Sequence, residues 1–148
     1  MDILDTLLNN QTVIIRTAFD SLLRSNLKHY SAASANANWQ RIEKLFDLTV
    51  KCIKEKNLVE IIEYSEKIAA ERYNSGYDLH EVHAAYNVLE EAIWGIILNN
   101  LDPNDFGRAL GLASTVLGAG KETLALTYIS LTGKKKPQSL DLTELFKG

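Results

Sequence analysis

The sequence has 148 residues, of which 46% are hydrophobic and 24% charged, values typical of one soluble globular domain. A net charge of -3, without a large basic face, argues against nucleic-acid binding, and a single cysteine excludes an internal disulfide. The acidic N-terminus is unlike a signal peptide and no apolar run is long enough to cross a bilayer, so we expect a cytoplasmic protein without membrane insertion.

Three helices are predicted in the first half of the chain. Apolar residues recur three, four and seven positions apart in residues 2–30, which predicts a first helix with an interruption at residues 9–11. Small polar residues at 31–38 predict a loop. Two further amphipathic segments predict helices over residues 39–54 and 58–74.

A tight corner is predicted after the third of these helices. Gly76 can adopt the left-handed backbone that closes a helix. Asp78 occupies an N-cap position, and Glu81 three residues later completes a capping box. The next helix is therefore expected to begin at residue 79, and it extends to about residue 99.

Arg72 lies on the apolar stripe of its helix, immediately before this corner. An unpaired buried charge costs several kcal/mol, so Arg72 needs a carboxylate partner. Glu71, Glu90 and Glu91 are the candidates. We favour an ion pair that fixes the corner over an arginine that binds a ligand.

The second half of the chain predicts two long helices and a tail. The helix over residues 79–99 has a broad apolar arc, typical of a central helix with several neighbours. Asp102 and Pro103 predict the start of a last helix over residues 103–131, which Thr132 and Gly133 would end. We therefore expect a helical domain over residues 1–133, followed by a linker and short amphipathic tail over residues 134–148.

Small residues form a stripe along the last helix, at Gly107, Gly111, Ser114 and Gly118. Each glycine inside a helix costs about 0.5–1 kcal/mol relative to alanine, so three of them suggest that another helix packs closely there. That helix belongs either to residues 2–30 of the same chain or to a second copy. The second alternative makes the stripe a dimer face.

The tail carries an apolar cluster at Leu142, Leu145 and Phe146. Such a short amphipathic segment either caps the domain loosely or docks into a groove of a partner.

Histidine is the one residue type that suggests a ligand site. His80 and His83 lie one helical turn apart, and His29 is the third histidine. Because a closed zinc site needs four ligands, we favour solvated or capping histidines over a metal site, haem ligation or pH sensing, and we predict no cofactor. The sequence has no phosphate-binding loop, zinc-protease motif or nucleophile elbow, so we predict that the protein is not an enzyme.

The segment from Ala70 to Trp94 combines an arginine, a glycine corner and a helix with an aliphatic, small and aromatic rhythm. It resembles the N-terminal domain of RsbR/RsbRD-type co-antagonists, which are bacterial stress-signalling proteins, and the resemblance covers about residues 58–131. The resemblance implies an all-helical, often dimeric sensory module, and some relatives are globin-like without haem. Such modules normally precede a STAS-type output domain, which residues 132–148 are too short to form, so we expect a stand-alone relative or one that acts in trans.

These observations together predict an all-α, antiparallel bundle of about five helices, with a globin-like arrangement compatible with the length. The predicted function is a non-enzymatic regulatory or sensory module that forms a homodimer and binds a signalling protein. The alternative is a globin-like sensor that binds haem, through His29, His80 or His83, or another apolar ligand.

Overall fold

The computed structural model describes residues 2–135, and this part of the chain contains helices and no strand. The all-α prediction is confirmed, but the count of about five is too low, because two short helices accompany the five long ones. The helices are α1 (Ile3–Asn9), α2 (Gln11–Arg24), α3 (Lys28–Ala32), α4 (Ala35–Glu55), α5 (Val59–Asn74), α6 (Leu79–Asn100), the 3-10 turn η1 (Pro103–Asp105) and α7 (Phe106–Lys135).

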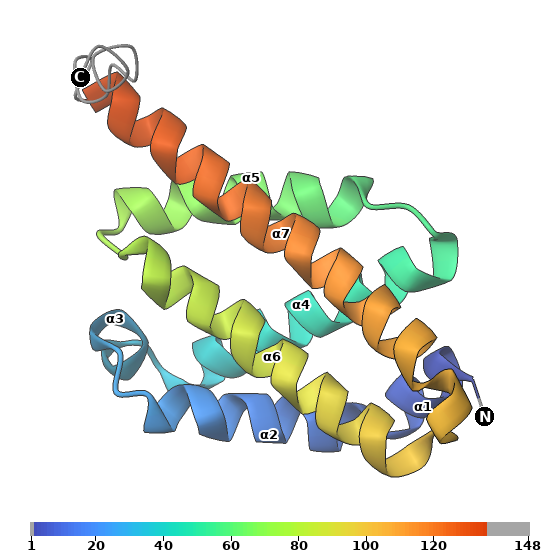
Figure 1. Cartoon of the computed structure of the whole chain (residues 1–148). Helices are drawn as coiled ribbons and strands as arrows, with labels where there is room; N and C mark the ends of the chain where they lie inside the picture. Colours follow the sequence, from blue (N-terminus) through green and yellow to red (C-terminus); the bar gives the residue numbers. More distant parts are fainter. Residues whose placement is uncertain (1, 136–148) are drawn as a thin grey trace, which may run out of the picture.

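The long helices alternate in direction along the chain, as expected for an antiparallel bundle (Figure 1). α6 and α7 lie side by side across α2, α4 and α5. α6 packs against α2 and α7 and also contacts α1, α4 and α5, so its predicted central position is confirmed. The C-terminal end of α7 projects past the other helices in Figure 1.

The N-terminal helix predicted over residues 2–30 is divided into three. The expected break occurs at Asn10, whose side-chain amide donates to the Thr6 carbonyl. A second break, which was not predicted, occurs at Asn26, which adopts a left-handed backbone with φ 51°. Asparagine tolerates this conformation better than most residues do, because its side chain can hydrogen-bond locally.

The loop predicted over residues 31–38 is largely helical. α4 begins at Ala35, and the Ser34 hydroxyl accepts a hydrogen bond from the Ala37 N–H at 3.1 Å. The small polar residues are therefore the capped first turn of α4. Asn38 is buried in this turn and donates to the Tyr30 carbonyl at 2.8 Å, which fixes α3 against α4.

The ends of the last helix match the prediction only at its start. The Asp102 carboxylate accepts from the Asn104 N–H at 2.9 Å, and Pro103 is the first residue of η1. The predicted stop at Thr132 and Gly133 is wrong, because α7 continues to Lys135. The domain boundary predicted at residue 133 thus lies within this helix. Among the described helices, none has the length and apolar character that crossing a membrane requires.

α7 packs most closely on α5 and α6 at Gly120. A Cβ atom built on Gly120 would lie 2.6 Å from Cε2 of Tyr86 and 3.1 Å from Oγ of Ser65. The two contacted side chains are hydrogen-bonded to each other, with 2.7 Å between Ser65 Oγ and the Tyr86 hydroxyl. No side chain larger than hydrogen fits between them, so Gly120 sets the distance between α7 and its two neighbours.

Candidate functional site

The corner between α5 and α6 has the local geometry that the sequence predicts. Gly76 adopts a left-handed backbone with φ 86°, and the Tyr77 N–H donates to the Arg72 carbonyl at 2.9 Å, which closes α5. Asp78 and Glu81 form the capping box of α6, in which Glu81 Oε1 accepts from the Asp78 N–H at 3.0 Å. The predicted roles of Gly76, Asp78 and Glu81 are therefore confirmed.

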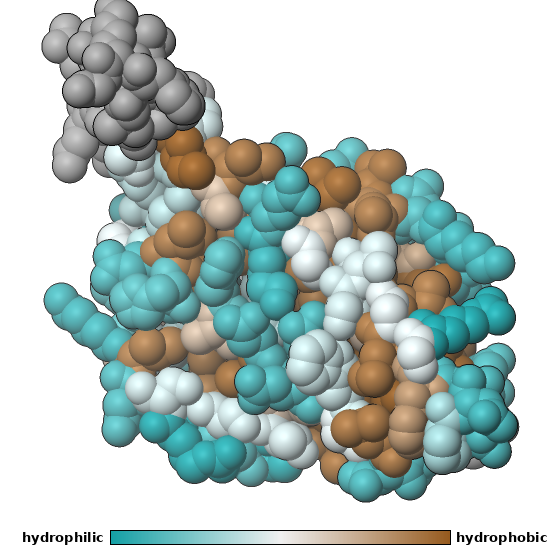
Figure 2. Space-filling view, in the orientation of Figure 1, coloured by the Kyte–Doolittle hydropathy of each residue, from teal (hydrophilic) through white to brown (hydrophobic). Residues whose placement is uncertain are grey.

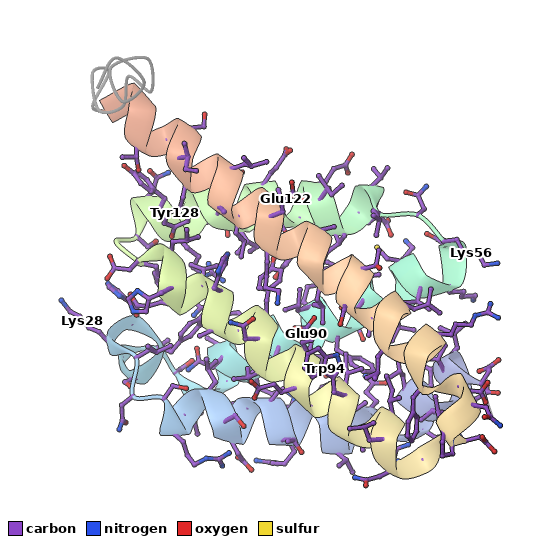
Figure 3. The ribbon with its side chains drawn as sticks, viewed as in Figure 1. Lys28, Lys56, Glu90, Trp94, Glu122 and Tyr128 are labelled. Atoms are coloured by element: carbon purple, nitrogen blue, oxygen red, sulfur yellow. The ribbon has the colours of Figure 1, made fainter. Side chains whose placement is uncertain are left out.

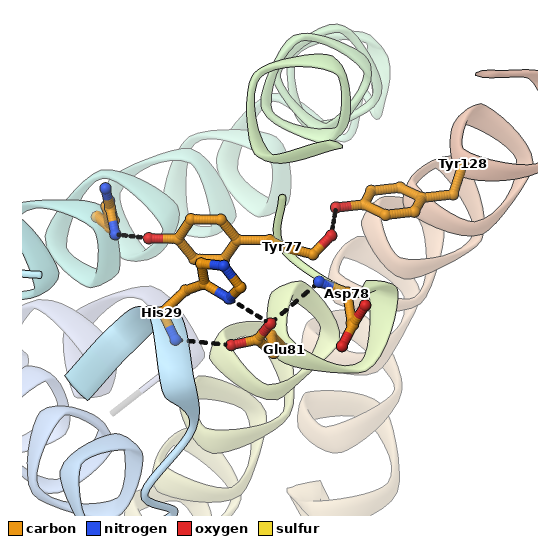
Figure 4. Close-up of polar contacts among 6 residues, drawn as sticks. His29, Tyr77, Asp78, Glu81 and Tyr128 are labelled. Atoms are coloured by element: carbon orange, nitrogen blue, oxygen red, sulfur yellow. Dashed lines mark hydrogen bonds and ion pairs between the residues drawn. The ribbon is translucent and has the colours of Figure 1, made fainter. Parts of the chain in front are cut away.

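Glu81 also connects the corner to α3. Its side chain is buried and accepts from the His29 N–H at 3.0 Å, and Oε1 lies 2.7 Å from Nδ1 of the His29 ring (Figure 4). Burial opposes the charged form of Glu81, but the hydrogen bonds from His29 and Asp78 outweigh it and lower the pKa of this carboxyl. One carboxylate thus caps α6 and holds α3 in place.

Tyr77, which sequence reasoning did not single out, is the centre of the corner. Its ring stacks on the His29 ring with 4.6 Å between centroids, and its hydroxyl accepts from Arg41 Nη1 at 3.0 Å. Its carbonyl accepts from the Tyr128 hydroxyl at 2.9 Å, which ties α7 to the corner (Figure 4). An apolar residue is common directly after a helix-closing glycine, so the position following Gly76 was the available signal.

Of the three predicted partners of Arg72, Glu71 is the one that lies within ion-pair distance, but because both residues belong to α5 this pair does not fix the corner. The Arg72 side chain is 11% exposed, and its Nη1 lies 3.7 Å from Oε2 of Glu71. Its Nε is buried and has no hydrogen-bond partner among the described residues. Glu90 is wrong as a partner because it pairs with Lys121 of α7 at 3.0 Å, and Glu91 is exposed on α6. Arg72 is therefore a nearly buried cation with one distant, half-exposed counter-charge.

Burial shifts the tyrosines around this region further toward the neutral form. It raises the pKa of Tyr30 and of Tyr128 to about 12, against the lowering effect of the Arg72 guanidinium on both. Burial also raises the pKa of Tyr64 and of Tyr86. These hydroxyls remain protonated at neutral pH and can donate hydrogen bonds, but they supply no negative charge.

The three histidines do not converge on a common site. His29 is bound to Glu81, and His83 Nε2 lies 3.1 Å from the Lys121 carbonyl oxygen. His80 is exposed at the start of α6. Within residues 2–135, no three histidine, cysteine or acidic side chains are grouped so that they could hold a metal ion.

The small-residue stripe on α7 is open. A Cβ atom built on Gly107, Gly111 or Gly118 would meet no heavy atom of the described residues within 4 Å, so the alternative that the stripe packs against residues 2–30 is wrong. Ser114 accepts a hydrogen bond from Nε1 of Trp94 on α6 at 3.1 Å. Figure 3 shows Trp94 at the boundary between α6 and α7.

Exposed apolar side chains occur on both α6 and α7. On α6, Trp94 is 39% exposed and Leu98 51%. On α7, Leu126 is 60% exposed and Ile129 65%, close to the end that projects past the bundle. In Figure 2, which views this face, pale residues of near-neutral hydropathy lie along α7 between brown apolar patches. We call the surface formed by Trp94, Leu98 and the four stripe residues the α6–α7 face.

A groove of about 410 Å³ lies at the opposite end of the molecule from the corner. It is bordered by α1, the end of α4 and the start of α7. Its lining combines apolar side chains with charged ones of both signs. The apolar residues include Ile3, Leu4, Ile53 and Leu101, and the charged residues are Asp2, Lys54, Lys56, Asp105 and Arg108. No histidine lines this groove. The predicted docking residues Leu142, Leu145 and Phe146 lie outside the described part of the chain.

Comparisons with protein-family models, with characterised proteins and with solved structures find no match to this chain. Its function has to be inferred from the surfaces and side chains described above.

Proposed function

We propose that the protein is a non-enzymatic regulatory or sensory module of bacterial signalling, located in the cytoplasm, that forms a homodimer and binds a signalling protein. The observation that carries this proposal is the open α6–α7 face. Three glycines of α7 lie there with free space above them, next to the exposed side chains of Trp94 and Leu98.

Packing among the helices of residues 2–135 does not account for these glycines. Each glycine inside a helix costs about 0.5–1 kcal/mol relative to alanine, and alanine would fit at all three positions. A helix surface without side chains lets a second helix approach closely. Because a twofold dimer brings the same patch of both copies together, α7 of each copy could lie against the stripe of the other.

The stripe is tested by replacing Gly111 with leucine, which places a large side chain in the open space. We expect wild-type protein to show a dimer by light scattering after size exclusion, and Gly111→Leu to shift it to the monomer. Gly133→Leu is the matched control, because Gly133 also lies in open space on α7 but is outside the stripe. A wild-type monomer at high concentration would refute the dimer, and a dimer that Gly111→Leu leaves intact would refute this face.

Partner binding through the tail is the second element of the proposal. We propose that Leu142, Leu145 and Phe146 dock onto the signalling partner. Co-purification from the native host, compared between the full chain and a triple alanine variant of these residues, identifies the partner by mass spectrometry. A partner recovered equally with both proteins would exclude the tail as the docking segment.

The alternative function, a globin-like sensor of haem or another apolar ligand, is favoured by the groove, because its volume is typical of small-molecule sites and its lining is largely apolar. Haem addition followed by absorption spectroscopy distinguishes these ligands. A Soret shift that His29→Ala, His80→Ala or His83→Ala removes would support haem. A spectrum without a shift would exclude haem. The alternative function would then require another apolar ligand, whose binding would be detected as an increase in the stability of the fold.

A further inference from the structure

A second, much smaller cavity lies where α3, α4, α5 and α6 meet, beside the corner. Its volume is about 20 Å³, and a single water-sized sphere needs about 10–15 Å³. It therefore has room for one water molecule or one monatomic ion. The polar residues of its lining come from all four helices and are Tyr30, Arg41, Tyr64, Arg72 and Tyr86.

The two arginines bring positive charge to this cavity without matching negative charge. Arg41 donates to neutral acceptors, the Asn38 amide oxygen at 3.3 Å and the Tyr77 hydroxyl at 3.0 Å. Among the described residues, Arg72 has one carboxylate partner, Glu71, at 3.7 Å from Nη1, and the Glu71 side chain is half exposed. The Arg72 guanidinium also lies over the ring of Tyr77, 5.6 Å from its centroid, but this neutral ring supplies no negative charge. The positive charge on the cavity wall is therefore incompletely balanced by the described side chains.

Arg72 also has an unused hydrogen-bond donor. Its Nε is buried and has no partner among the described residues, which is costly for a charged group. The tyrosines of the lining cannot supply a counter-charge, because their hydroxyls remain protonated at neutral pH. Both guanidiniums act electrostatically on the Tyr30 hydroxyl, so the two charges and this hydroxyl lie in one neighbourhood.

We infer that this cavity binds one small monovalent anion of halide size between Arg41 and Arg72. Such an ion fits the volume, accepts from the guanidinium donors and offsets their charge, whereas a water molecule offers only a dipole. The volume favours a monatomic ion over a phosphate or the carboxylate of a larger ligand. This inference does not depend on dimerisation, because the α6–α7 face is a different surface.

An anion in this position would connect α4 to α5, because Arg41 belongs to α4 and Arg72 to α5. A ligand that binds the folded state alone stabilises it in proportion to the logarithm of its concentration. The expected result is a fold whose thermal stability depends on the type of anion and not only on ionic strength.

The test replaces sodium gluconate, whose anion is too large for the cavity, by sodium bromide at constant ionic strength. We expect the unfolding midpoint of the wild type to be about 2–4 °C higher in bromide and to rise with the logarithm of the bromide concentration. Arg72→Gln, which removes the charge but keeps a polar side chain, should lose this rise. Arg24→Gln is the matched control, because Arg24 is exposed on α2 and bonds only the Ser21 hydroxyl.

The inference would be overturned if bromide changed the unfolding midpoints of wild type and Arg72→Gln by the same amount, or changed neither. If Arg72→Gln does not fold, anomalous scattering from wild-type crystals grown in bromide decides the question. A bromide peak between the Arg41 and Arg72 guanidiniums is the expected result, and a cavity that contains only water would refute the site.

Discussion

On one side of α7, Gly120 lies so close to Tyr86 and Ser65 that a single methyl group would overlap the tyrosine ring. On the other side, Gly107, Gly111 and Gly118 have open space above them. The same residue type thus has two explanations within one helix. A packed glycine reflects the distance between helices inside the bundle, whereas an open glycine needs a reason that the described helices do not supply.

The largest expected effect comes from replacing a glycine by leucine, in separate variants, on the packed side and on the open side of α7. Gly120→Leu should lower the free energy of unfolding by more than about 3 kcal/mol, because the side chain overlaps Tyr86. Gly111→Leu should leave the stability of the monomer within about 1 kcal/mol of the wild type. Urea unfolding followed by circular dichroism measures both. Equal losses for the two variants would remove the distinction between the sides.

The second prediction concerns the corner between α5 and α6, where the Tyr128 hydroxyl of α7 donates a hydrogen bond to the Tyr77 carbonyl. Glu81→Gln should cost about 1.5–3 kcal/mol at neutral pH, because hydrogen bonds to a charged carboxylate become bonds to a neutral amide.

This cost should depend on pH in a defined direction. The pKa of Glu81 is lowered in the folded state, so the ionised carboxylate stabilises the protein above its unfolded pKa of about 4.5. That contribution is lost as the pH falls below 4.5 toward the folded value. The difference between wild type and Glu81→Gln in urea unfolding should therefore narrow in acid, and a constant difference would contradict the lowered pKa.

The third prediction separates the hydrogen bond beside Gly120 from the packing there. Tyr86→Phe removes the bond to Ser65 and leaves that buried hydroxyl without its partner, which should cost about 1–2 kcal/mol. Since the ring itself is kept, Gly120→Ala should remain destabilising in the Tyr86→Phe background. If Gly120→Ala becomes harmless there, the hydroxyl and not the ring makes the tight contact.

The smallest effect is expected from alanine on the open side. Gly111→Ala should stabilise the monomer by about 0.5–1 kcal/mol, because alanine has the higher helix propensity and fits the space. Thermal unfolding should be followed at protein concentrations where light scattering finds only the monomer. A loss of stability under these conditions would mean that α7 is already in contact with another segment at this position.

The sequence by itself determined the secondary structure over most of the described chain. Apolar periodicity predicted α4 to α7, and residue chemistry at Gly76, Asp78 and Glu81 predicted the corner, because helix caps depend on residues only a few positions apart. The same local reasoning missed the break at Asn26, where asparagine tolerates a left-handed backbone, and the continuation of α7 through Gly133. A single glycine costs only about 1 kcal/mol inside a helix, so it does not have to end one.

Only the tertiary structure decided which partners the polar residues have. Glu90 was a candidate for Arg72 by sequence, but helix packing places it beside Lys121, and Glu81 reaches His29 across 52 positions of sequence. The tertiary structure likewise decided that α7 packs closely on its neighbours at Gly120, while the glycines of the regularly spaced stripe face open space. Helical spacing defines which residues share a face, but which faces meet depends on how the helices cross, and that is a property of the whole chain.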